Sequence, residues 1–145
     1  MKAQAIAGDS VELSVNFPKS FDFALLRRGM ILCDPKNVCY AIKEFMAEIT
    51  TFELKYPLIR GKSVYVHTRF NRVEGILVRI DKSFIGKEER KNPKCVASNT
   101  NALVHIRLQE GACMELYSNY SSLGRIVLRD ISDTLASGLV TELLK

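Results

Sequence analysis

Several motifs of catalytic and nucleotide-binding proteins are missing from this 145-residue chain. No G-x-x-x-x-G-K-[ST] stretch occurs, so the sequence supplies no backbone cradle for nucleotide phosphates. Neither G-x-S-x-G nor H-E-x-x-H is present, which removes the commonest signatures of serine hydrolases and zinc proteases. We therefore expect no catalytic residue, no metal and no cofactor in this chain.

The sequence contains few cysteines and histidines that could bind a metal or form a catalytic thiol site. The four cysteines are scattered without a C-x-x-C pair, and only two histidines, His67 and His105, could help them. We expect reduced cysteines packed as small apolar side chains. The sequence alone leaves open a small Cys–His or metal-dependent enzyme, because a thiol and an imidazole can meet in space from any spacing.

Long apolar runs are also missing. No stretch is long enough to cross a bilayer, and residues 1–8 hold no apolar core of signal-peptide length, so we expect a soluble, cytoplasmic protein without a membrane partner. The formal net charge of +5 permits an anionic partner such as RNA or an acidic protein face. It is equally consistent with a charge that serves solubility alone.

Short apolar runs broken by turn residues make up most of the sequence and predict an all-β fold. The segment 41–52 is ambiguous, since its apolar residues also fit helical spacing; its β-branched and aromatic content favours a strand. The clearest two-residue alternation lies at 102–108. Further strands are expected at 11–15, 30–33, 64–68, 73–85, 112–116, 123–130 and 134–144, with a turn at Gly111 and a hairpin across 131–133.

A domain boundary is predicted near Asp34–Val38, where Asp34-Pro35-Lys36-Asn37 forms a turn or linker. Residues 1–38 offer only two or three strands, too few for an independent sheet, whereas residues 39–145 offer about six, enough to close a small barrel. We therefore expect residues 1–38 to be the remnant of a larger domain.

The segment from Leu123 to Asp130 reads L-G-R-I-V-L-R-D. It resembles the G-R-[FI]-x-[LV]-R-[DY] segment in the third domain of elongation factor 1-alpha-like translational GTPases. Flanking segments 101–104, 114–117 and 136–142 fall in the family's order, and 7–11 with 28–33 is similar to the closing strands of the second domain. The resemblance implies a six-stranded antiparallel Greek-key barrel preceded by a few strands of the second-domain barrel.

Three branches of this family compete: the tRNA-delivering elongation factor, the class II release factor, and the HBS-type ribosome-rescue GTPase that partners Pelota. Segments 50–54, 57–58, 101–104 and 115–117 look most like the last, whereas 31–35 is similar to the release factor. The resemblance implies a partner-binding module for a Pelota-like or release-factor-like protein on the ribosome, or for tRNA in the elongation-factor case. The resemblance further implies a role in ribosome rescue, mRNA surveillance or translation termination, with GTP and Mg²⁺ expected only in a G domain that this chain lacks.

Partner-binding residues are assigned to the matched segment: Gly124, Arg125, Arg129 and Asp130. In a strand, Arg125, Val127 and Arg129 share one face, with the two arginines ~13 Å apart. Guanidinium groups suit carboxylate or phosphate pairing across an interface, although ion pairs inside the barrel to Asp130 or Glu115 are equally compatible with the pattern. Where relatives place a glycine-containing turn, this chain has Asp130-Ile131-Ser132-Asp133.

The charged stretch 82–94 is predicted to be a solvated loop. Its basic side chains would steer an acidic partner electrostatically and add little specific affinity. These residues are Lys82, Lys87, Arg90, Lys91 and Lys94.

Overall fold

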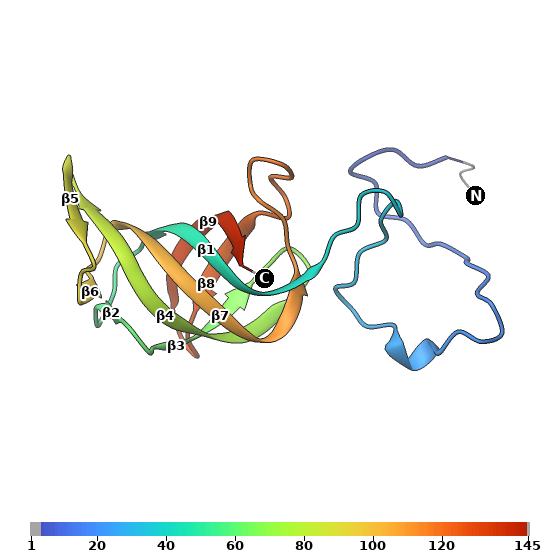
Figure 1. The fold of residues 1–145 in the computed structure, drawn as a ribbon, viewed down its shortest axis with the longest axis horizontal. Coiled ribbons are helices and arrows are strands. Elements are labelled where there is room, and N and C mark those ends of the chain that lie inside the picture. Colours follow the sequence, from blue (N-terminus) through green and yellow to red (C-terminus); the bar gives the residue numbers. More distant parts are fainter. Residues whose placement is uncertain (1–3, 145) are drawn as a thin grey trace.

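Regular structure within residues 4–144 is almost entirely β-strand, and the first strand begins at Ala41 (Figure 1). The computed structural model describes residues 4–144. Its elements are η1 (Phe23–Leu25), a single 3-10 turn, and the strands β1 (Ala41–Thr51), β2 (Leu58–Ile59), β3 (Ser63–His67), β4 (Arg72–Ile85), β5 (Glu88–Lys91), β6 (Cys95–Val96), β7 (Asn101–Cys113), β8 (Arg125–Arg129) and β9 (Thr134–Leu144). The all-β prediction is confirmed. No helix within residues 4–144 is long and apolar enough to span a membrane.

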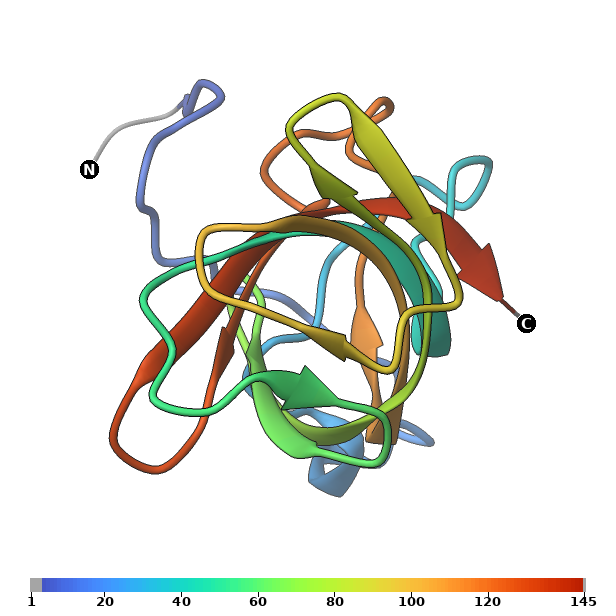
Figure 2. The ribbon, with the colours of Figure 1, turned by 90° about the vertical axis from the view of Figure 1, so that its left-hand side faces the viewer.

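Six of these strands close into an antiparallel barrel. They pair in the order β3-β8-β9-β1-β7-β4, and a further pairing between β3 and β4 completes the ring, which Figure 2 shows end-on. The strand β5 extends the edge of β4, and β2 and β6 form a separate two-stranded sheet. The closed six-stranded barrel expected from the sequence is therefore confirmed.

The longest strand, β4, contains two register shifts and pairs with three neighbouring strands. Its register against β7 shifts between Leu77 and Arg79 and again between Ile80 and Lys82. Each extra residue increases the local twist and bends the strand. As a result β4 pairs with β3, β5 and β7 along its fourteen residues.

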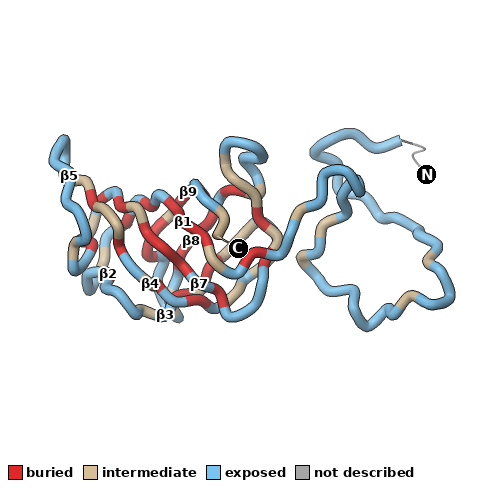
Figure 3. Tube along the Cα trace, in the orientation of Figure 1, coloured by how far each residue is buried: buried red, intermediate tan, exposed pale blue. Residues whose placement is uncertain are grey.

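Alternating side chains from the strands fill the barrel. Phe45, Ala47 and Ile49 of β1 are fully buried, as are Val104 and Ile106 of β7. Figure 3 shows buried stretches along the barrel strands. The segment 41–52 is thus a strand, as predicted, because β7 and β9 supply hydrogen-bonding partners on both of its sides. Its helical spacing carries no structural meaning.

The loop predicted at 82–94 is wrong for residues 82–91, and only residues 92–94 lie outside the β4–β5 hairpin. Residues 82–85 continue β4, and β5 returns antiparallel to it after a two-residue turn, in which Gly86 has a φ of 62°. The strand β5 is exposed along its whole length, so it needs no apolar residue. Strand formation there was hidden by the charged composition that such an exposed edge strand carries.

The predicted turn at Gly111 is also wrong. The strand β7 runs through Gly111 to Cys113, where Cys113 and Ala112 pair with Ala41 and Ile42 of β1. The predicted strand at 112–116 is therefore the end of β7 followed by non-strand chain. The strands expected at 64–68, 73–85, 123–130 and 134–144, and the hairpin across 131–133, form as β3, β4, β8 and β9 within a residue or two.

The segment 4–40 contains no strand, so the strands predicted at 11–15 and 30–33 do not form. Their alternating apolar residues are present, but Val11, Leu13 and Val15 are exposed and no neighbouring strand pairs with them. A strand without a partner leaves its backbone groups unpaired, which is why the pattern alone is insufficient. The few preceding strands of the fold prediction are therefore missing from residues 4–40.

The predicted domain boundary stays a prediction. Strand structure starts three residues beyond the predicted limit at 38, and the ribbon of residues 4–40 extends away from one end of the barrel (Figure 1). Residues 1–3 of the first predicted domain and residue 145 of the second lie outside the described residues.

Ile49→Ala should destabilise the barrel because Ile49 is fully buried in its core. We expect the free energy of unfolding to fall by about 2–5 kcal/mol, measured by chemical denaturation. Ile131→Ala is the matched control, since Ile131 is 92% exposed in the β8–β9 turn and should change stability by less than about 0.5 kcal/mol. Equal effects of the two substitutions would contradict the assignment of the core.

Candidate partner-binding surface

The strand β8 presents two arginines on the outside of the barrel. Ile126 and Leu128 are buried, whereas Arg125 and Arg129 are exposed and Val127 is half-buried between them. This alternation confirms the predicted division of β8 into a core face and an outer face. The two guanidinium groups are thus available on the face that was assigned to a partner.

Arg125 is positioned by a tyrosine from the segment between β7 and β8. Its guanidinium lies 5.4 Å from the ring centroid of Tyr117, and its Nη2 donates a hydrogen bond to the Tyr117 hydroxyl at 3.3 Å. The backbone of Tyr117 is held in turn, because its N–H donates to the carbonyl of Val140 at 3.0 Å. Such a contact limits the rotamers of a long side chain and leaves other guanidinium N–H groups free.

Arg129 makes no ion pair among residues 4–144, and neither does Arg125. The internal ion pairs to Asp130 or Glu115 that the sequence allowed are therefore not formed. Asp130 instead lies 3.7 Å from the Nζ of Lys62. The role of the two arginines in partner binding stays a prediction.

Gly124 and Asp130, at the two ends of the matched segment, have structural roles in this fold. A Cβ atom on Gly124 would lie 2.3 Å from the Cα of Tyr117, so only glycine allows the two backbones to approach. The Asp130 carboxylate accepts hydrogen bonds from the backbone N–H groups of Asp133 and Ser132, which lower its pKa. These bonds form the β8–β9 turn, in which residues 130–133 include no glycine.

A groove of about 440 Å³ lies beside Arg125 on the outer face. In the cross-strand register, Leu139 of β9 faces Arg125 on one side and Glu48 of β1 on the other. The groove thus combines a positive side, an apolar middle and a negative side. Its lining residues include Glu48, Thr50, Arg125, Val127, Ser137 and Leu139.

Sequence reasoning missed four residues that surround the two arginines. Tyr117 follows the strand predicted at 112–116, Tyr65 and His67 lie on β3 next to β8, and Arg72 lies on β4, on the other side of β3. The alternation of buried Val64 and Val66 already indicates that Tyr65 and His67 face outward. Their position next to Arg129 depends on strand order, which the sequence does not reveal.

Four of the five predicted steering residues lie on the β4–β5 hairpin, which projects at one end of the barrel (Figure 1), and Lys94 lies between β5 and β6. Lys82 is paired internally, with its Nζ 2.7 Å from the Oε1 of Glu89. Lys87, Arg90, Lys91 and Lys94 are exposed and make no ion pair within the described chain. The steering role of all five residues stays a prediction.

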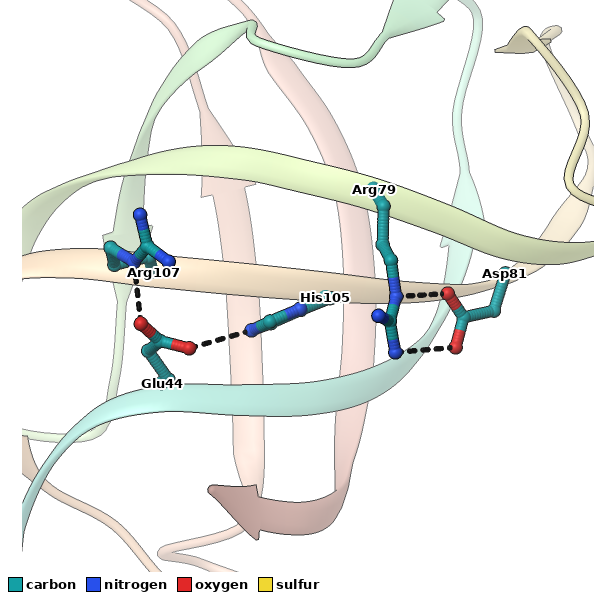
Figure 4. A network of polar contacts seen from close by, with 5 residues as sticks. All are labelled: Glu44, Arg79, Asp81, His105 and Arg107. Carbon is teal, nitrogen blue, oxygen red and sulfur yellow. Dashed lines mark hydrogen bonds and ion pairs between the residues drawn. The ribbon is translucent and has the colours of Figure 1, made fainter. Parts of the chain in front are cut away.

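A second polar cluster crosses β1, β7 and β4 on the outer face (Figure 4). The Glu44 carboxylate bonds to the Nε of Arg107 and, at 3.0 Å, to the Nε2 of His105. The bonds from Arg107 and His105 lower the pKa of Glu44, and Arg79 pairs with Asp81 nearby at 2.6 Å. The two carboxylates are each paired within the cluster, and the bonds of Glu44 tie β1 to β7. The buried Nδ1 of His105 has no hydrogen-bond partner among the described residues.

Thiol and metal chemistry gain no support from the structure. Burial, followed by the neighbouring Cys113, raises the pKa of Cys39 to about 11, the opposite of what a catalytic thiolate requires. All four cysteines are free, and no group of three metal-ligating side chains occurs in the described part of the chain. The partner surface therefore remains the strongest candidate site.

Comparison with known proteins places the chain among translation factors. The model of a family described as GTP-eEF1A C-terminal domain-like matches residues 44–141. This range contains the whole barrel except the first three residues of β1 and the last three of β9. Protein HBS1 of Drosophila melanogaster is 31% identical over 140 residues, which are 94% of this chain and 20% of that protein. The match therefore covers β8 and the strands around it.

A release-factor subunit and a solved structure are also similar to the chain, with 30% and 26% identity compared with 31% for Protein HBS1. The eukaryotic peptide chain release factor GTP-binding subunit of Candida maltosa is 30% identical over 144 residues, covering 97% of this chain and 20% of that protein. A crystal structure of Sup35 complexed with GMPPNP matches with a TM-score of 0.78 and 26% identity, over 86% of this chain and 31% of that one. The chain thus spans about a fifth of the length of these curated relatives.

Gly124→Ala should destabilise the fold because the added methyl group would collide with the backbone of Tyr117. We expect a loss of about 1–3 kcal/mol in the free energy of unfolding, measured by chemical denaturation. Ser122→Ala, an exposed position in the same loop, is the control and should change stability by less than about 0.5 kcal/mol. A Gly124→Ala variant as stable as the wild type would show that the close approach is not required.

Proposed function

The chain belongs to the GTP-eEF1A C-terminal domain-like family, and from this premise we propose that it is the partner-binding C-terminal module of a translational GTPase acting in ribosome rescue and mRNA surveillance. Its partner would be a Pelota-like or release-factor-like protein. Of the three branches we favour the HBS-type one, because segments 50–54, 57–58, 101–104 and 115–117 resemble that branch. A class II release factor is the second candidate, favoured by the similarity to release-factor subunits.

The observation that carries this proposal is the outer face of β8. Arg125 and Arg129 are exposed there on either side of half-buried Val127, and both lack an acidic partner among residues 4–144. Arginine is enriched among residues that dominate protein–protein affinity, since its planar group binds carboxylates in a bidentate manner. An acidic partner segment would satisfy both side chains.

The groove beside Arg125 supports an elongated contact. A partner segment lying in it could place an apolar side chain on Leu139, an acidic group at Arg125 and a basic group at Glu48. This arrangement of an apolar centre between charged rims is typical of protein interfaces. The surface therefore suits a protein more than a uniformly anionic nucleic acid.

In this proposal, GTP binding and hydrolysis take place in another domain of the parent protein. The chain has no phosphate-cradling motif, so GTP and Mg²⁺ would bind a G domain of the parent protein, and this module would transmit partner binding to it. Ribosome-dependent function implies a cytoplasmic location. tRNA would be a partner only in the elongation-factor case.

Arg129→Ala should weaken binding to a Pelota-like protein by roughly 1–4 kcal/mol, because a charge-paired arginine contact would be lost. The affinity is measured by calorimetry with the full chain, and the melting temperature should barely change because Arg129 makes no internal ion pair. Arg60→Ala, an exposed arginine outside β8, serves as the control. Normal binding by a variant that unfolds easily would identify Arg129 as a structural residue and refute the interface.

Reversing charges on the β4–β5 hairpin should affect mainly the association rate. The double variant Lys87→Glu with Lys91→Glu is expected to slow association and to reduce its salt dependence, leaving dissociation almost unchanged, since exposed charges act at long range. Stopped-flow or surface-based kinetics at several ionic strengths provides the measurement. A change confined to the dissociation rate would mean that the hairpin lies inside the interface.

A further inference from the structure

The strand next to β8 adds further polar side chains to the outer face. Tyr65 of β3 faces Arg129 of β8 on one side and Glu74 of β4 on the other, and His67 faces Val127 and Arg72 in the same way. Because Val64 and Val66 are buried, Tyr65 and His67 point outward. Two arginines from strands distant in the sequence therefore flank the same short strand.

Arg72 is held over this strand by an aromatic contact. Its guanidinium carbon lies 4.1 Å from the ring centroid of Tyr65. Stacking over a ring uses the face of the guanidinium and leaves its N–H groups at the rim available for hydrogen bonds. Arg72, like Arg129, forms no ion pair among the residues that the structure describes.

The two arginines act on the same imidazole. The pKa of His67 is lowered first by burial and then by the charges of Arg129 and Arg72. The geometry agrees: the Arg72 guanidinium lies over the ring of Tyr65, which is the cross-strand neighbour of Arg129. His67 is the next outward residue on β3 and the cross-strand neighbour of Arg72. An anion bound among these groups would relieve the repulsion between the two guanidinium groups and would favour the protonated imidazole as a third donor.

We propose that Arg72, His67 and Arg129 form an anion-binding site that takes carboxylate groups of an acidic segment in the partner protein. This inference rests on the proposed function for the identity of the partner. It adds the chemistry that the partner must carry and two residues, Arg72 and His67, that the similarity of the 123–130 segment does not indicate.

The surrounding charges favour carboxylates of a protein over the backbone of a nucleic acid. Glu74 lies in the same cross-strand row as Tyr65 and Arg129, and Glu48 lines the groove on the other side of β8. A nucleic acid carries a phosphate at every step and would be repelled by these acids, whereas an acidic peptide segment can place its charges selectively. Tyr65 and half-buried Val127 add the apolar contact that protein interfaces use.

The test uses hexaglutamate as the probe, titrated into the full chain and followed by NMR. We expect saturable shifts of the signals of His67, Tyr65 and the neighbouring backbone, and a rise in the pKa of His67 when the probe is bound. Arg72→Met and Arg129→Met should each weaken the apparent affinity about fivefold, in line with the loss of one exposed charge pair. Arg60→Met removes the same charge elsewhere and should have less than about a twofold effect.

Three results would overturn the site. Equal weakening by all three substitutions would mean that the probe responds to net charge alone. If hexaglutamate shifts no NMR signals of β3 or β8 in the wild type, the anion binds elsewhere. This measurement needs no variant, so it does not depend on whether a variant folds. Tighter binding of hexauridylate with the same dependence on Arg72 and Arg129 would identify a nucleic-acid site.

Measurements with the Pelota-like or release-factor-like protein separate this inference from the proposed function. If that protein fails to bind the wild type while hexaglutamate binds as expected, the proposed function is wrong and the anion site stands. If the protein binds and Arg129→Met weakens it but Arg72→Met leaves it unchanged, the function stands and the three-residue site is wrong. If both variants bind the protein more weakly than the wild type, the result supports both the proposed function and the anion site.

Discussion

Closure of the barrel by β3 is the constraint on which the rest of this structure depends. This five-residue strand pairs with β4 through Tyr65 and Glu74 and with β8 through Tyr65 and Arg129. Without it, β4 and β8 would each have an unpaired edge, and the interior would be open to water. The same pairing brings Arg72 and Arg129 to either side of one strand, so the geometry that completes the core also creates the cationic part of the outer face.

The charged side chains on the outer face fall into two groups. One group forms ion pairs within the barrel: Glu44 with His105 and Arg107 and Lys82 with Glu89 across strands, and Arg79 with Asp81 within β4. Such exposed pairs add little stability individually, but they occupy the donors and acceptors that a ligand would need. Arg72, Arg125 and Arg129 have no acidic partner in residues 4–144 and touch tyrosine rings or strand neighbours instead. The guanidinium groups of Arg72 and Arg125 are held against tyrosine rings and retain N–H groups for other partners, and Arg129 is the cross-strand neighbour of Tyr65. Such side chains are expected on a surface that meets another molecule.

The segment 4–40 shows the limit of local pattern. Val11, Leu13 and Val15 alternate with polar residues as strand residues do, yet they remain exposed because no other strand lies beside them. The segment 41–52 shows the opposite case, in which a pattern compatible with a helix becomes a strand because β7 and β9 flank it. In both segments the availability of a partner strand decided the outcome, since β-structure satisfies its backbone only through neighbours.

The sequence by itself determined the all-β class, the strand limits at 134–144 and the alternation that turns Arg125 and Arg129 outward, because these depend on short-range periodicity and on turn residues. The resemblance of residues 123–130 was also sufficient to indicate the family, which the match to residues 44–141 confirms. Only the tertiary structure decided that residues 82–91 form a hairpin, that Tyr117 holds Arg125, and that β3, with Tyr65 and His67, lies between Arg72 and Arg129. These features arise from strand order and register between distant segments, and such long-range pairing leaves no local signal in the sequence.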